Sequence, residues 1–189
     1  MRNNPSRAVK NLACCAMLVA VSVVMARVFS FSATGIRWSL DKFPLFLAGM
    51  LFGPVLGAFA GFSADFIGSL MQFGFNPFLC PPAILYGLFG GLFQRFLVKK
   101  FSGVRLAAAY AFPVVIGSVL YQSCALAWFY FDGAYLDGLL FYLGSRSIQF
   151  AIMLVAETFI LYTLMKLKVF TRLGLWPPIA KRGNKNDCQ

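Results

Sequence analysis

The sequence predicts an all-α membrane protein with six transmembrane helices. Of its 189 residues, 60% are hydrophobic and only 12% are charged, whereas a soluble domain carries about a quarter charged residues. A spanning helix needs about 20 mostly apolar residues, so six spans with short turns use most of the chain. We therefore expect one membrane domain over residues 12–168, between a cytoplasmic segment 1–11 and a basic cytoplasmic tail 169–189.

The elements follow from the positions of charged residues and of Gly/Pro breaks. Six helices are expected, at residues 12–29, 43–52, 55–71, 83–98, 106–130 and 146–167. The second is short because Gly53-Pro54 ends it, since proline lacks the backbone donor and clashes with the preceding turn. Residues 30–42 and 72–82 are expected to form polar or irregular connections. Asp137-Gly138 is expected to belong to a loop before the last helix.

The distribution of basic residues predicts the orientation. The net charge is +11. With the amino terminus inside, 13 of the 17 basic residues lie on the inner side, and only Arg27, Arg37, Lys42 and Arg146 lie outside. Cytoplasmic loops of membrane proteins carry an excess of Lys and Arg, so both termini are expected to be cytoplasmic. Nucleic-acid binding is not favoured, because no basic stripe with interleaved aromatic residues is present.

Small residues recur at helical spacing, which lets helix backbones approach closely in lipid. They form three series, namely Gly49, Gly53, Gly57 and Gly61; Gly87 and Gly91; and Ala16 and Ala20. We expect most of them to serve packing within the chain.

The sequence lacks the residues that several kinds of catalytic and metal-binding sites require. The chain has no histidine and no GxxxxGK[ST] loop, which argues against catalytic triads and against a Walker-type ATP site. Its five cysteines form no CxxC pair, so neither a metal nor a cofactor is expected. The sequence thus favours binding or transport over catalysis.

Polar side chains within a membrane are costly and tend to mark function. Asp65 lies in the third expected helix and Glu157 midway along the last. Asp65 has two interpretations. It serves the structure, as a cap or as the ion-pair partner of an arginine such as Arg27, or it contacts a ligand. For Glu157, pairing with a neighbouring helix or an external partner is favoured over ligand contact.

The outer helix ends gather guanidinium, hydroxyl and amide groups with aromatic rings. An aromatic belt at the membrane surface accounts for part of the rings, and a flat organic anion would suit the remainder, since arginines bind carboxylates. The candidate substrate-binding residues are Arg27, Arg37, Ser39, Asp65, Asn76, Phe78, Trp128, Tyr142, Arg146 and Gln149.

One stretch resembles a known family. From Arg37 to Pro54 the chain carries Arg-x-Ser, then a proline, then Ala-Gly-x-Leu-Phe-Gly-Pro. This pattern is similar to the substrate-binding (S) components of energy-coupling factor (ECF) transporters, most of all the folate branch. The stretch from Gly61 to Gly68 and Tyr86-Gly87-Leu continue the resemblance. The chain departs from the pattern at Leu40-Asp41-Lys42, where the family usually has Phe-Gly.

The resemblance implies an ECF S-component bundle in a bacterial cell membrane. Such a protein would capture folate or another water-soluble vitamin outside the cell. It would deliver the vitamin by reorienting in the lipid, coupled to a transmembrane (T) subunit and two ATPase subunits on other chains. Ala16 and Ala20 match the first-helix motif that docks on the T subunit. The alternatives are a non-transport membrane scaffold and a solitary proton-coupled carrier that uses Asp65 and Glu157.

Overall fold

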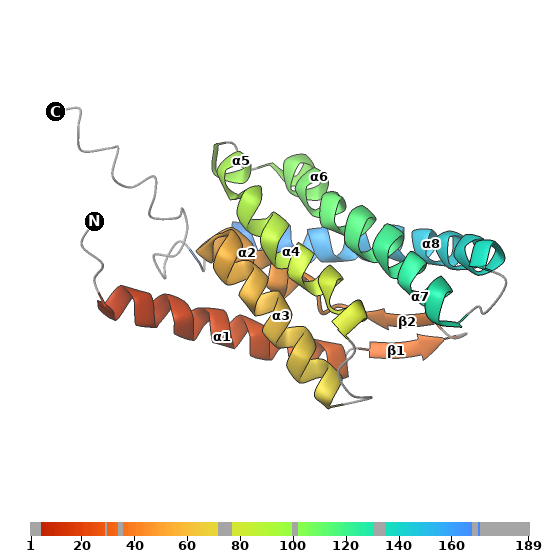
Figure 1. Ribbon diagram of the computed structural model, residues 1–189. Coiled ribbons are helices and arrows are strands. Elements are labelled where there is room, and N and C mark those ends of the chain that lie inside the picture. Colours follow the sequence, from red (N-terminus) through yellow and green to blue (C-terminus); the bar gives the residue numbers. More distant parts are fainter. Residues whose placement is uncertain are drawn as a thin grey trace.

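The computed structural model describes residues 5–28, 30–33, 36–71, 77–99, 102–130, 135–167 and 170. The helices are α1 (Pro5–Val28), α2 (Phe43–Phe52), α3 (Pro54–Leu70), η1 (Pro77–Leu79), α4 (Pro81–Leu92), α5 (Gln94–Lys99), α6 (Gly103–Pro113), η2 (Val114–Tyr121), α7 (Gln122–Tyr130) and α8 (Tyr135–Lys166), and the strands are β1 (Ser30–Ala33) and β2 (Ile36–Ser39). They form an elongated helical bundle in which α1 begins and α8 ends at one end, while the strands lie at the other (Figure 1). The predicted all-α class is confirmed.

The apolar helices fit a membrane protein. Among the described residues, 9–28, 103–128 and 138–166 are long and apolar enough to cross a membrane. Three shorter apolar helices, over residues 43–52, 54–70 and 77–92, complete a set of six. The number of apolar helices of at least ten residues in the described part of the chain agrees with the expected six, and six membrane crossings stay a prediction.

The connection between α1 and α2 contains a small antiparallel hairpin. Ser30 pairs with Ser39 and Ala33 with Ile36 across β1 and β2. The sequence predicted only a polar connection here. The hairpin brings the chain back from the end of α1, so that Ser39 and the residues after it enter the bundle.

Helix α2 is the centre of the core. All its residues from Phe43 to Leu51 are buried, and Phe46 packs edge-on against Tyr110 of α6 with ring centroids 5.0 Å apart. A helix that is apolar on every side belongs in an interior. It ends as predicted at Gly53, whose φ of 98° suits a residue without a Cβ atom, and Pro54 then begins α3.

Backbone contacts at glycines join α2, α3 and α4. A Cβ atom on Gly87 of α4 would overlap the carbonyl group of Gly57 in α3, and one on Gly49 of α2 would overlap the carbonyl of Gly87. Gly61 meets the Ala83 carbonyl in the same way. The expectation that these glycines serve packing within the chain is therefore confirmed.

The fifth expected helix is continuous but irregular. Residues 103–130 run through α6, the π-helical η2 and α7, with Pro113 at the junction of α6 and η2. Across the interface with α4, Tyr86 and Ser118 form a buried hydrogen bond of 2.9 Å between their hydroxyl oxygens. This bond ties the π-helical segment to the core.

Several expected boundaries are wrong. Helix α1 begins at Pro5 and not at residue 12, and α6 begins at Gly103 and not at residue 106. The last helix begins at Tyr135 and not at residue 146, so Asp137 and Gly138 lie in α8 and not in a loop. No proline stands between 135 and 166, and one glycine costs a helix only about 1 kcal/mol, so the helix continues through it. The fourth expected helix is divided by a turn at Phe93 into α4 and α5.

Candidate functional site

A cavity of about 410 Å³ opens among α1, α2, α3, α4 and α8. Its size is in the range of small-molecule sites. The polar residues that line it are Ser22, Arg27, Ser39, Asp41, Lys42, Asp65, Ser69, Gln122, Arg146, Gln149 and Glu157. Apolar residues such as Leu45, Phe150 and Met153 complete the wall.

The cavity brings together five of the residues predicted from the sequence, namely Arg27, Ser39, Asp65, Arg146 and Gln149. Three others lie elsewhere among the described residues. Phe78 and Trp128 are 63% and 75% exposed, and Tyr142 is not part of the cavity wall. The side chain of Arg37 and the whole of Asn76 lie outside the described residues.

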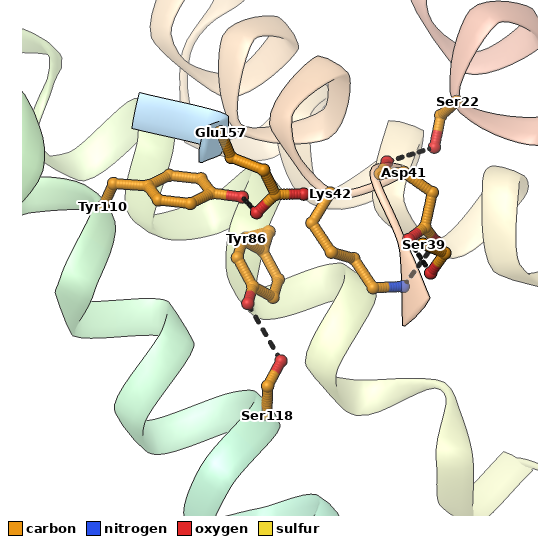
Figure 2. Close-up of polar contacts among 8 residues, drawn as sticks. All are labelled: Ser22, Ser39, Asp41, Lys42, Tyr86, Tyr110, Ser118 and Glu157. Carbon is orange, nitrogen blue, oxygen red and sulfur yellow. Dashed lines mark hydrogen bonds and ion pairs between the residues drawn. The ribbon is translucent and has the colours of Figure 1, made fainter. Parts of the chain in front are cut away.

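The segment that links β2 to α2 supplies a charged cluster. The Lys42 ammonium lies 2.9 Å from Asp41 Oδ2, and the Ser39 hydroxyl donates to Asp41 Oδ1 at 2.7 Å. From α1, Ser22 donates to the Asp41 backbone carbonyl at 2.7 Å. Figure 2 shows these side chains gathered beside Ser22. The cluster fixes the loop against α1.

The Asp41–Lys42 ion pair keeps both groups charged. Burial by itself would raise the pKa of the Asp41 carboxyl, but the Lys42 ammonium and the Ser39 hydroxyl hold that pKa below its ordinary value. Burial would lower the pKa of Lys42, and the Asp41 carboxylate outweighs it, so that pKa is raised. The sequence analysis did not select either residue, although the departure at Leu40-Asp41-Lys42 marked the place.

Arg27 and Asp65 face the cavity from α1 and α3. They form no ion pair with each other, and Asp65 Oδ2 is buried without a hydrogen bond, as is Arg27 Nε. Gly68 leaves room for the guanidinium, since a Cβ atom there would lie 3.8 Å from Arg27 Nη2. The interpretation of Asp65 as an ion-pair partner of Arg27 is wrong for this structure. Asp65 Oδ2 and Arg27 Nε therefore remain available to a ligand.

Helix α8 contributes a cation beside an aromatic ring. The Arg146 guanidinium carbon lies 5.9 Å from the centroid of the Phe150 ring, which is within the range of a cation–π contact. Gln149, one residue before Phe150, is buried in the same wall. A flat ligand with an acidic group would find a ring and a guanidinium side by side.

Glu157, also on α8, connects the cavity to the core. The Tyr110 hydroxyl donates to Glu157 Oε2 at 2.5 Å, so the predicted pairing with a neighbouring helix is confirmed. Unlike the prediction, Glu157 also lines the cavity. Its position there follows from the way α8 crosses α2 and α6, which the sequence of α8 alone does not show.

The balance of charge in the cavity suits binding. The cavity wall contains three acidic and three basic side chains. The acidic ones are Asp41, Asp65 and Glu157, and the basic ones are Arg27, Lys42 and Arg146. The described part of the chain holds no group of three or more His, Cys, Asp or Glu side chains that could bind a metal. The arrangement offers hydrogen-bond donors and acceptors together, as a polar organic molecule requires.

A second hollow, of about 600 Å³, lies on the surface between α1 and α3. It is lined almost wholly by apolar residues, including Ala16 and Ala20, with Phe59 and Ile67 across from them. Ala16 and Ala20 are exposed, and so are their neighbours Met17 and Val24. We call this surface the α1–α3 groove.

Known proteins resemble the chain in both sequence and fold. Residues 10–171 match the family model of the ECF transporter substrate-specific component. The crystal structure of FolT bound with folic acid has a TM-score of 0.64 and 26% identity, covering 80% of this chain and 92% of that one. The crystal structure of the biotin S-component of an ECF-type ABC transporter has a TM-score of 0.55 and 19% identity, covering 88% and 95%.

A curated protein of Mycoplasma pneumoniae, "Uncharacterized protein MG098 homolog", is 29% identical over 110 residues. The match takes in 52% of this chain and 23% of that protein. The chain therefore spans about a quarter of the length of this relative.

Proposed function

Since the chain belongs to the family of ECF transporter substrate-specific components, we propose that it captures folate or a closely related vitamin outside a bacterial cell. The observation that carries the proposal is the cavity, in which Arg27 and Arg146 can hold carboxylates and Phe150 can stack on a ring. FolT, which is 26% identical, has been crystallised with folic acid, and this similarity favours folate over other vitamins.

Delivery would depend on partners. The α1–α3 groove is apolar and exposes Ala16 and Ala20, so a helix of a T subunit could approach its floor closely. Two ATPase subunits on other chains would supply the energy, and this chain would turn over in the lipid to release the vitamin. Its apolar exterior, with Val55, Phe59 and Val155 exposed, suits contact with lipid.

The proposed orientation has both termini in the cytoplasm. The end of the bundle that carries the β1–β2 hairpin would then face outside (Figure 1). Arg27 lies in the last turn of α1 and Ser39 at the end of β2, and the inner end would carry most of the basic residues. Cysteine labelling of intact cells tests this. In a variant that keeps Cys188 and has the other four cysteines replaced by serine, reagent that reaches Cys188 only after the membrane is opened supports the proposal. Labelling from outside contradicts it.

Calorimetry on the purified protein tests the substrate. Folic acid is expected to bind in the micromolar range or more tightly, and biotin is expected not to bind. If biotin binds and folic acid does not, the chain serves another vitamin. If neither binds, and the protein co-purifies with cell-wall enzymes but without a T subunit or ATPases, the alternative of a membrane scaffold is favoured.

A further inference from the structure

Helix α5 and the beginning of α6 carry a basic surface, at the end of the bundle away from the hairpin (Figure 1). Four basic residues fall between positions 95 and 105, namely Arg95, Lys99, Lys100 and Arg105. No acidic residue occurs between positions 66 and 131, so this part of the sequence supplies no counter-charge. The positive-inside rule accounts for basic residues at a helix end, but not for the aromatic rings that lie beside them.

Arg105 lies against an aromatic ring of the neighbouring helix. Its guanidinium carbon is 5.2 Å from the centroid of the Phe96 ring of α5, which is within the range of a cation–π contact. A ring attracts the positive charge, but the five N–H donors of a guanidinium still need acceptors. Among the described residues, neither Arg105 nor Arg95 forms an ion pair. The Phe96 ring therefore positions a cation that can bind an anion from outside the chain.

The rings around Phe96 form an exposed apolar surface. The ring centroid of Phe93, in the turn after α4, lies 6.5 Å from that of Phe96, 6.1 Å from that of Phe89 and 5.7 Å from that of Phe112. We call these four residues the α4–α6 aromatic surface. Phe96 and Phe112 are 45% and 48% exposed. Phe112 follows Arg105 by two turns of α6, so it lies about 10 Å farther along the helix and on nearly the same side. The aromatic surface thus extends from the guanidinium along the side of the bundle.

Buried leucines hold the cation and the rings in place. Leu97 of α5 and Leu106 of α6 are fully buried, and they directly follow Phe96 and Arg105 in the sequence. A short helix with one buried and one exposed side is suited to the boundary between membrane and water. The surface is therefore set by the fold before a partner arrives.

We propose that this surface binds an anionic phospholipid, with the phosphate on the Arg105 guanidinium and an acyl chain along the α4–α6 aromatic surface. A guanidinium is suited to two oxygens of one phosphate group, and Arg95, which is exposed on α5, adds positive charge. A soluble anion would leave the rings uncovered, whereas a phospholipid carries both the charge and the apolar chain that the two parts of the surface require. Arg105 does not line the cavity, so the proposal goes beyond the proposed function and does not depend on the vitamin.

Native mass spectrometry of the purified protein tests the site. The protein in detergent is offered equal amounts of phosphatidylglycerol and phosphatidylcholine with the same acyl chains, and the bound copies of each lipid are counted. A basic residue at the membrane surface favours an anionic lipid by roughly fivefold, so the wild-type protein is expected to prefer phosphatidylglycerol by at least that factor. Arg105→Gln should remove most of the preference. Arg105→Lys should restore it only in part, because an ammonium lacks the planar fork of a guanidinium.

Lys10→Gln is the matched control, because it removes the same charge from an exposed position on α1 and should leave the preference unchanged. If it lowers the preference as much as Arg105→Gln does, the basic surface as a whole attracts the lipid, and the inference is overturned. The same holds if the wild-type protein shows no preference. Inorganic phosphate, at an ionic strength matched with sodium chloride, is expected not to displace the lipid; displacement would mean that the site takes a free anion, which also overturns the inference. None of these outcomes bears on vitamin binding.

Discussion

Two regions of the bundle are built on opposite principles. Where α2, α3 and α4 meet, glycines bring backbone against backbone, as at Gly57 and Gly87, and leave no room for even a methyl group. Beside them, larger polar side chains from α1, α3, α8 and the segment between β2 and α2 surround a cavity of about 410 Å³. Helix α2 borders both regions, since Gly49 faces α4 and Leu45 lines the cavity.

The contrast shows how a small membrane protein can hold an open cavity. In lipid, helices associate through close packing and polar contacts and not through the hydrophobic effect. The glycine contacts join α2, α3 and α4 closely, and α1 and α8 complete the wall of the cavity. The glycine region should therefore control stability, and the cavity should control binding.

The largest effect is expected from Gly87→Leu. Its Cβ atom would overlap the Gly57 carbonyl, so α3 and α4 must separate. Overpacking typically costs about 1–3 kcal/mol, and a clash with backbone should exceed that range. We expect little monodisperse protein in detergent. The control is Gly144→Ala in α8, where nothing lies within 4 Å; a stable Gly87→Leu protein would break the comparison.

Ala16→Trp is expected to abolish uptake while vitamin binding is retained. The indole would fill the α1–α3 groove, which Ala16 lines, and would hold off a docking helix. Ala16 lines the groove and not the cavity, so calorimetry should give the wild-type affinity. Met17→Trp is the matched control, because Met17 is 69% exposed but does not line the groove. Normal uptake by Ala16→Trp would contradict the docking role.

Arg27→Ala should weaken folic acid binding by roughly ten- to a hundredfold, as expected when a charged hydrogen bond is lost. The guanidinium lines the cavity, and its Nε is buried without a partner. Arg105→Ala serves as the control, since Arg105 lies over the Phe96 ring at 5.2 Å and does not line the cavity. Equal affinities for both variants would remove Arg27 from the site.

Much of the fold could be predicted because local signals set it. Helix α2 has the expected bounds, since Gly53-Pro54 ends it whatever surrounds it. The π-helical geometry of η2 could not be predicted, because Val114–Tyr121 reads as an ordinary apolar helix. The start of α8 was missed because Asp137 and Gly138 resemble loop residues.

The candidate site was predictable only in part. Arg27, Ser39 and Arg146 could be named because topology places them at the same end of the bundle. Asp41 and Lys42 enter the cavity only through the fold of the β1–β2 hairpin, which brings them back to Ser22 of α1. A single sequence shows neither the hairpin register nor the contact.

The smallest effect is expected from Tyr86→Phe, which separates stability from binding. Tyr86 is fully buried, and its hydroxyl bonds only Ser118 among the contacts described. Loss of one such bond costs about 1 kcal/mol, so the melting temperature should fall by a few degrees. Because Tyr86 does not line the cavity, the affinity for folic acid should be unchanged. A marked loss of affinity would mean that the two regions are coupled through η2, since Ser118 belongs to that segment.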